Sequence, residues 1–206
     1  MKLVGSSSQI ALHPLYDASG TVATGGVAQL VLAQSMMRSH LILGNNSNDP
    51  LWFEFGSARA TCALTSGAVS SFSITNAGFG FTRPPNVILL GGGPPPGQST
   101  GPYLGLNQPN GFAPTHPAQA HAVLVGGAVS SFVIDDPGAN YLIAPYVFMY
   151  NDSLDPYGCA IPSANVGVLI QSGAPPLIYN GTVCPTDAIA VYGATTGDGF
   201  LCKWMD

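Results

Sequence analysis

Hydrophobic and polar residues alternate with a period of two in several short segments of this chain. Residues 58–64 and 118–124 place small or apolar side chains at every second position, and the pairs Ser66-Gly67 and Gly126-Gly127 follow them. This alternation is typical of half-buried β-strands, and such residue pairs are preferred in tight hairpin turns. Only residues 27–37 are ambiguous between helix and strand. The pattern therefore predicts an all-β protein.

An internal repeat occupies the centre of the sequence. The hexapeptide GAVSSF forms residues 67–72 and recurs unchanged at residues 127–132, an offset of 60 positions. At this offset, ten of the 21 residues from 67 to 87 are identical without any gap. Each copy predicts a hairpin followed by a third short strand. We therefore predict two related β-meander repeats, over about residues 58–90 and 118–150.

The segments outside the repeats predict a second unit. Residues 1–57 and 171–206 contain further apolar runs, and we expect them to form one discontinuous β-sandwich or barrel with residues 58–170 inserted. The chain should leave and re-enter this unit near Gly56 and Gly173. Its core should join the two segments, with Leu41, Trp52, Phe53 or Phe55 packed against Ile189, Val191 and Phe200.

The stretch between the two copies is rich in glycine and proline. Residues 91–117 include the run GGGPPPG, which is incompatible with a helix or a central strand. Loops of this length in compact domains are usually functional or disordered. We predict an ordered surface loop that is a candidate contact arm.

The small number of charged residues excludes some classes of binding partner. Charged residues make up 7% of the 206 residues, compared with about 25% in an ordinary soluble domain. Five bases stand against ten acids, too few to line a nucleic acid or an anionic membrane surface. The N-terminus has no signal-peptide core and no run reaches the length of a membrane span, so we expect neither feature. A surface this poor in charge favours self-association.

The sequence offers little catalytic chemistry. It lacks the common nucleotide-binding, hydrolase and zinc-protease motifs. Glu54 is the only glutamate and is expected to face solvent from a strand. Asp135-Asp136 and residues 151–155 are expected to shape surface turns and not to bind calcium. We predict no enzyme, no catalytic residues, no cofactor and no metal.

Histidines and cysteines are dispersed. His40 lies at the edge of an apolar run and is expected to be packed or interfacial, and no histidine stands beside a second metal ligand. The cysteines are expected to be buried reduced thiols, with one disulfide as the alternative. The residues concerned are His13, His40, His116 and His121, and Cys62, Cys159, Cys184 and Cys202.

Both parts of the chain resemble proteins of tailed-bacteriophage virions. Residues 25–31, 38–47 and 51–56 are similar to a small β-domain pattern, roughly GGTAQ … R-x-x-L-x-I-x-N-x-S … LW-x-x-FG, and residues 188–197 resemble its closing segment. The repeats resemble modules of the form G-x-V-x-x-I-x-I-x-N-x-G-x-G-Y-x-x-P-P-x-V. In the second copy Asn140 replaces the second glycine and Ala144 the first proline, which predicts a distorted copy.

The resemblance implies a structural role on a virus particle. The leading expectation is a capsid decoration (cement) protein that is assembled in host cytoplasm, lies on the capsid surface and binds the major capsid protein. A homotrimer is favoured, since decoration proteins commonly lie on local threefold axes. The alternative is a tail, fibre or head-spike component that contacts the host surface. A glycan-acting enzyme is the remote alternative, because such enzymes need paired carboxylates and Glu54 has no clear partner.

Overall fold

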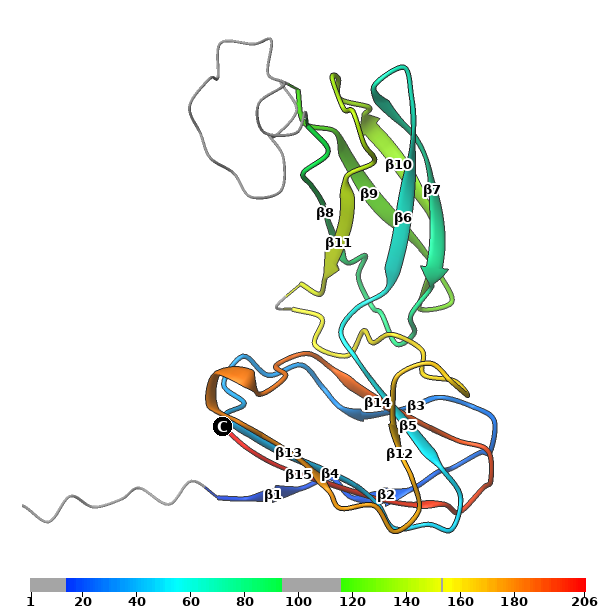
Figure 1. Ribbon diagram of the computed structural model, residues 1–206, viewed down its shortest axis with the longest axis vertical. Helices are drawn as coiled ribbons and strands as arrows, with labels where there is room; N and C mark the ends of the chain where they lie inside the picture. Colours follow the sequence, from blue (N-terminus) through cyan, green and yellow to red (C-terminus); the bar gives the residue numbers. More distant parts are fainter. Residues whose placement is uncertain (1–13, 94–115, 153) are drawn as a thin grey trace, which may run out of the picture.

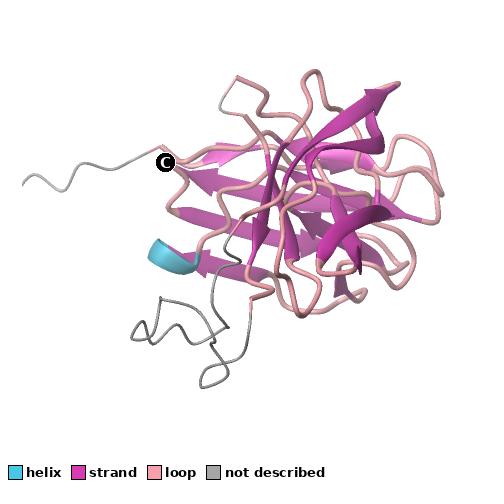
Figure 2. Cartoon of the chain, turned by 90° about the horizontal axis from the view of Figure 1, so that it is seen from above, coloured by secondary structure: helices cyan, strands magenta, loops and turns pink. Residues whose placement is uncertain are grey.

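The computed structural model describes residues 14–93, 116–152 and 154–206. It shows a β-sandwich with a second β-module standing on one of its sheets (Figure 1). The fold is all-β, as predicted: within the described residues, the regular structure is strand except for one 3-10 turn, Gly181–Val183 (Figure 2). No helix in this part of the protein is long and apolar enough to cross a membrane.

Two antiparallel sheets make up the sandwich. The first has the strand order β1 (Tyr16–Asp17), β15 (Gly199–Met205), β4 (His40–Asn45) and β13 (Leu177–Asn180), and β2 (Gly20–Thr21) also pairs with β15. The second has the order β12 (Val168–Ile170), β5 (Leu51–Phe55), β14 (Ile189–Gly193) and β3 (Gln29–Leu32). Each sheet combines strands from the start and the end of the chain.

The core between these sheets joins the two ends of the sequence. Leu41 and Phe53 pack with Ile189, Val191 and Phe200 in one buried cluster, as expected from the alternating pattern. The rings of Phe53 and Phe200 meet edge to face, with their centroids 6.4 Å apart. These contacts link residues far apart in sequence, so the sandwich can form only after both ends of the chain have come together.

A buried arginine ties the loops at one end of the sandwich. Arg38 is 3% exposed. Its guanidinium donates hydrogen bonds to the carbonyl oxygens of Ala33 at 2.6 Å, Pro185 at 2.8 Å and Asp187 at 2.9 Å. Burial lowers the pKa of Arg38 and raises that of Asp187. The side chain thus supplies donors to three backbone carbonyls in place of water.

The module leaves the sandwich after Gly56 and returns at Ala160. The Ala160 N–H donates to the Gly56 carbonyl at 2.8 Å, and Phe79 and Cys159 exchange two backbone hydrogen bonds of 2.8 and 3.0 Å. The predicted return near Gly173 is therefore wrong. Gly173, with φ of +70°, lies between two sandwich strands, and the first of them, β12, pairs with β5 before residue 171. The turn signal there belongs to the sandwich.

The module consists of two hairpins and a shared ribbon. The hairpins join β6 (Arg59–Thr65) to β7 (Ala68–Asn76) and β9 (Gln119–Val125) to β10 (Ala128–Asp136). The third strands, β8 (Asn86–Leu90) and β11 (Tyr146–Tyr150), pair with each other and not with their own hairpins. The repeats are therefore interlocked and are not two separate meanders. The backbone N–H and C=O groups along the edge of a third strand can pair with the third strand of the other copy as well as with the hairpin of the same copy.

The two copies are related by a pseudo-twofold axis. In the ribbon, Ile88 lies opposite Phe148, its equivalent at the offset of 60, and the register continues symmetrically on both sides. The rings of the equivalent residues Phe72 and Phe132 are stacked with centroids 4.6 Å apart. A shared core of residues from both copies lies between the strands.

Backbone hydrogen bonds between the copies follow the same symmetry. Val69 N–H donates to the Pro137 carbonyl at 2.8 Å, and Val129 N–H donates to the Ala77 carbonyl at 2.9 Å. A second equivalent pair joins Phe81 N–H to the Gly127 carbonyl at 3.0 Å and Tyr141 N–H to the Gly67 carbonyl at 2.9 Å. These equivalent positions in the two copies therefore have equivalent backbone partners.

The second copy keeps the geometry of the first. Asn140 has φ of +64°, compared with +76° for its equivalent Gly80. Asparagine is one of the few non-glycine residues that adopt this left-handed region readily. The predicted distortion is thus wrong at this position. Most of the predicted contact arm, residues 94–115, lies outside the described residues, as does His13.

Candidate functional site

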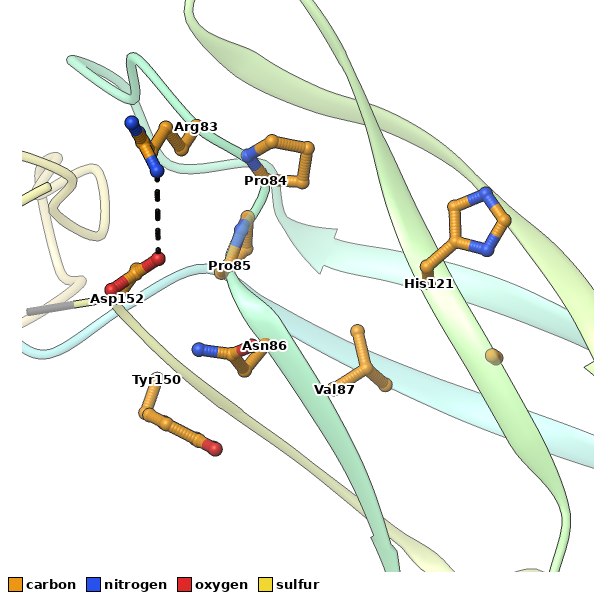
Figure 3. Close-up of a pocket in the computed structure, with 9 residues that line it drawn as sticks. Arg83, Pro84, Pro85, Asn86, Val87, His121, Tyr150 and Asp152 are labelled. Atoms are coloured by element: carbon orange, nitrogen blue, oxygen red, sulfur yellow. Dashed lines mark ion pairs between the residues drawn. The ribbon is translucent and has the colours of Figure 1, made fainter. Parts of the chain in front are cut away.

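An open cleft of about 550 Å³ lies on the module, where the start of β8 meets the end of β11 and faces β9. Figure 3 shows Arg83 and Asp152 facing each other at one end and His121 at the other, with Asn86 and Tyr150 along the ribbon. The remaining lining residues are Pro84, Pro85, Val87 and Ala120. Polar side chains thus surround a floor of proline and small apolar groups.

A buried carboxylate fixes the turn that carries Arg83. Asp155 is 1% exposed, and its Oδ2 accepts the backbone N–H groups of Thr82 at 2.7 Å and Arg83 at 2.8 Å. Asn151 is also buried and donates to the Gly158 carbonyl. The prediction of a surface turn over residues 151–155 is wrong for these two side chains, because Asp155 binds the turn before β8 and Asn151 binds a carbonyl of its own loop. That contact is invisible in sequence.

The polar side chains of the cleft face solvent. Arg83 Nη1 and Asp152 Oδ2 are 4.0 Å apart, and both side chains are partly exposed. An exposed ion pair of this kind stabilises a fold by less than about 1 kcal/mol. Asn86 and Tyr150 are opposite each other in the ribbon, and the Tyr150 ring is stacked on Phe148 with centroids 6.0 Å apart. Stacking on Phe148 thus restricts the Tyr150 ring, while part of this ring remains exposed to solvent.

The outer face of the β8–β11 ribbon is apolar and exposed. Alternation along both strands turns every second side chain outward, and five of these are large and 40–67% exposed: Ile88, Leu90, Tyr146, Phe148 and Tyr150. We call these five residues the ribbon face. Contiguous apolar surface of this kind commonly marks an interaction site.

Glu54 is buried, so the prediction that it faces solvent is wrong. It is 5% exposed and forms an ion pair with Arg59. The outer side of β5 is covered by the chain that returns from the module. Cys159 packs with Ala188 and Ala190, and a Cβ at Gly167 would lie 3.3 Å from a Glu54 carboxylate oxygen. The covering segment is distant in sequence, so alternation within β5 could not predict it.

Other acids and histidines form local pairs. Asp136 accepts the Gly138 N–H at 2.8 Å, which is the predicted turn-shaping role. Its second oxygen lies 2.8 Å from His116, and Asp135 lies 2.8 Å from His121 at the cleft. His40 is half-buried on β4. Within residues 14–93, 116–152 and 154–206, no group of three His, Cys, Asp or Glu residues is placed to hold a metal ion.

The four cysteines are free thiols, and three of them are buried: Cys159, Cys184 and Cys202, with Cys62 half-buried. Burial raises the pKa of Cys159 to about 12 and that of Cys202 to about 12. Such thiols react slowly in the folded state because the thiolate is the nucleophile.

Stability should fall at alkaline pH because of these thiols. Their pKa is raised in the folded state from 9.0 to about 12, so the unfolded chain releases protons first and stability is lost as pH rises above 9. Between pH 7 and pH 10 we expect a loss of about 1.4 kcal/mol per thiol, measured by urea unfolding. Cys202→Ala should be less pH-sensitive than the wild type by about that amount. Equal pH dependence of the two proteins would contradict the prediction.

Sequence reasoning did not find the cleft. Its residues come from three separated segments, and the repeat motif that contains Pro84, Pro85 and Val87 indicates strands and turns but no cleft. The sequence signal that could have indicated the cleft is the difference between the two repeats at equivalent positions. No protein-family model, curated protein or solved structure matches this chain.

Proposed function

We propose that this chain is a structural, non-enzymatic protein of a tailed-bacteriophage virion, and specifically a capsid decoration (cement) protein. In this proposal the sandwich binds the major capsid protein and the inserted module projects from the capsid surface. The sequence patterns of both parts support it, since each resembles phage virion proteins. Cement proteins stabilise a shell by burying interface area and making hydrogen bonds, which requires no catalytic group.

The observation that carries the proposal is an exposed apolar end of the sandwich. Met36, Met37 and Val183 are 71–74% exposed. The segments that carry them are joined where Gly181 N–H donates to the Ser39 carbonyl at 2.8 Å, near the C-terminus (Figure 1). Methionine is adaptable and is frequent on protein-binding surfaces. We propose this methionine patch as the surface that contacts the capsid.

Self-association belongs to the same proposal. The ribbon face supplies a second apolar surface, and charged residues that would oppose contact between copies are scarce. The homotrimer remains the favoured assembly. A tail, fibre or head-spike protein is the second candidate, and the observation that favours it is the polar cleft beside an exposed tyrosine.

Removing the module should leave particle binding intact. Gly56 and Ala160 are joined by a backbone hydrogen bond of 2.8 Å, so a short Gly/Ser linker can replace residues 58–159. The resulting sandwich should remain folded by circular dichroism and should bind virions that lack the full-length protein, measured by co-sedimentation. Met36→Ser with Met37→Ser in the full chain should weaken binding about tenfold or more.

The matched control is Val125→Ser, which removes a comparably exposed apolar side chain, 69% exposed, from the end of β9 and outside the ribbon face. It should leave co-sedimentation unchanged. A folded sandwich that fails to bind while the full chain binds would assign attachment to the module. Failure of the full chain to bind virions would refute the decoration proposal.

A further inference from the structure

The pseudo-twofold symmetry provides an internal comparison for the cleft. Every lining residue has an equivalent 60 positions away, and on the ribbon and the hairpins the equivalents share the same register. The backbone differs at Asp152, whose equivalent Gly92 has φ of +85°. The equivalents of Pro85, Val87 and Ala120 are the identical residues Pro145, Val147 and Ala60. The apolar floor is therefore repeated on the other side of the module.

The polar side chains are not repeated. Moving by 60 positions replaces each of them with an apolar, aromatic or small residue: Arg83 becomes Ile143, Asn86 becomes Tyr146, His121 becomes Thr61, Tyr150 becomes Leu90 and Asp152 becomes Gly92. The charged and amide groups are thus confined to one of two otherwise equivalent places. No charge or amide occupies any of these five equivalents.

This difference between the two copies distinguishes side chains that the fold requires from side chains that are available to bind a ligand. The second copy forms the same strands and register without the side chains of Arg83, Asn86 and His121, so the backbone there does not require them. The contact between Arg83 and Asp152 is an exposed pair 4.0 Å apart, which adds little stability. Asp152 Oδ1 also accepts the Leu154 N–H at 3.1 Å, so one of its oxygens shapes the local turn. A set of polar groups that the fold does not need, gathered beside a cleft, points to a binding role.

The chemistry of the set defines the ligand class. Arg83 offers a fork of donors, Asp152 offers acceptor oxygens and Asn86 offers both, so neighbouring hydroxyl groups could be held in a bidentate manner. The ring of Tyr150 and the floor of Pro84 and Pro85 suit a flat apolar face.

The charges nearly cancel. Asp152 lies near Arg83, and Asp135 lies 2.8 Å from His121. A phosphate or another strong anion would therefore meet carboxylates at both ends of the cleft, and a cation would meet Arg83. A neutral ligand with many hydroxyls and an apolar face fits best.

We propose that the cleft binds a neutral saccharide unit, with Tyr150 as the stacking platform and Arg83, Asn86 and Asp152 as the hydroxyl-binding groups. His121 closes the opposite end of the cleft. This site is independent of where the protein lies on a particle, because it is formed within a single chain.

The test is a titration of the purified full-length protein followed by amide NMR. The probes are maltose, lactose and N,N′-diacetylchitobiose at millimolar concentrations, with N-acetylneuraminic acid and inorganic phosphate as anionic comparisons. At least one neutral saccharide should shift the amides of residues 83–87 and 150–152. The equivalent residues 143–147 and 90–92 should not shift, which controls for non-specific effects within the same molecule.

Two variants complete the test. Tyr150→Leu copies the equivalent Leu90, which the backbone already accommodates, and it should weaken saccharide binding about tenfold. The control Tyr146→Asn introduces the amide at the other end of the ribbon and should leave the affinity unchanged. Shifts with the anions alone, no cleft shifts with any probe, or full affinity in Tyr150→Leu would each overturn the proposal.

Discussion

An Arg38→Met variant is expected to be less stable than the wild type by about 3–5 kcal/mol. The substitution keeps a long side chain but removes the donors to the carbonyls of Ala33, Pro185 and Asp187. Each buried acceptor left without a partner costs about 1–3 kcal/mol, and methionine regains part of the total by packing. Urea unfolding followed by tryptophan fluorescence would measure the change.

Arg83→Met is the matched control, because it removes the same group from an exposed position. Its side chain makes one ion pair of 4.0 Å, and its loss should change stability by less than about 1 kcal/mol. If the two variants were equally stable, the hydrogen bonds of Arg38 would contribute little to the fold. Other interactions would then have to hold the loops at the apolar end of the sandwich in place.

A Gly138→Ala variant should lose about 2–4 kcal/mol of stability. Gly138 has φ of +64°, a conformation that costs an alanine about 1 kcal/mol or more. A Cβ there would also lie 2.6 Å from both the Ala118 nitrogen and the His116 oxygen, so the backbone would have to move. Overpacking of this kind costs a further 1–3 kcal/mol, and thermal unfolding would record the sum.

Gly126→Ala separates the two contributions. Gly126 has φ of +60°, and a Cβ there would meet nothing within 4 Å. Only the conformational cost applies, so this variant should lose about 1 kcal/mol. Equal losses in both variants would mean that the close approach at Gly138 relaxes without cost.

The sequence predicted the parts of the fold that depend on local pattern. Alternation located the hairpins β6–β7 and β9–β10, and apolar runs located the sandwich strands that place Leu41 and Phe53 against Phe200. Period-two alternation states which residues share a face of a strand. It does not state which neighbour a strand pairs with.

The errors share this physical origin. The repeat pattern predicts that β8 and β11 belong to their own repeats, yet these strands pair with each other, since their edges offer the same hydrogen-bonding groups to either neighbour. Glu54 was expected in solvent, yet a segment more than 100 residues later covers it. Both outcomes depend on contacts between segments that are distant in sequence, which no local pattern records.

The cleft was missed for a different reason. Its polar residues look like ordinary surface residues when each is read alone. They stand out only when Arg83 is compared with Ile143, and Asp152 with Gly92, at equivalent places in the fold. That comparison depends on the symmetric register of the ribbon, which local sequence patterns do not record.

The exchange of third strands between the repeats bears on how such a module arises. A chain with a single copy would hold its third strand without a partner, and two such chains would complete one another's ribbon across a true twofold axis. The module has the geometry of that homodimer, joined into one polypeptide. Duplication of an ancestral single-copy gene would then free each half to diverge, so that one half could acquire new side chains while the other preserved the shared architecture.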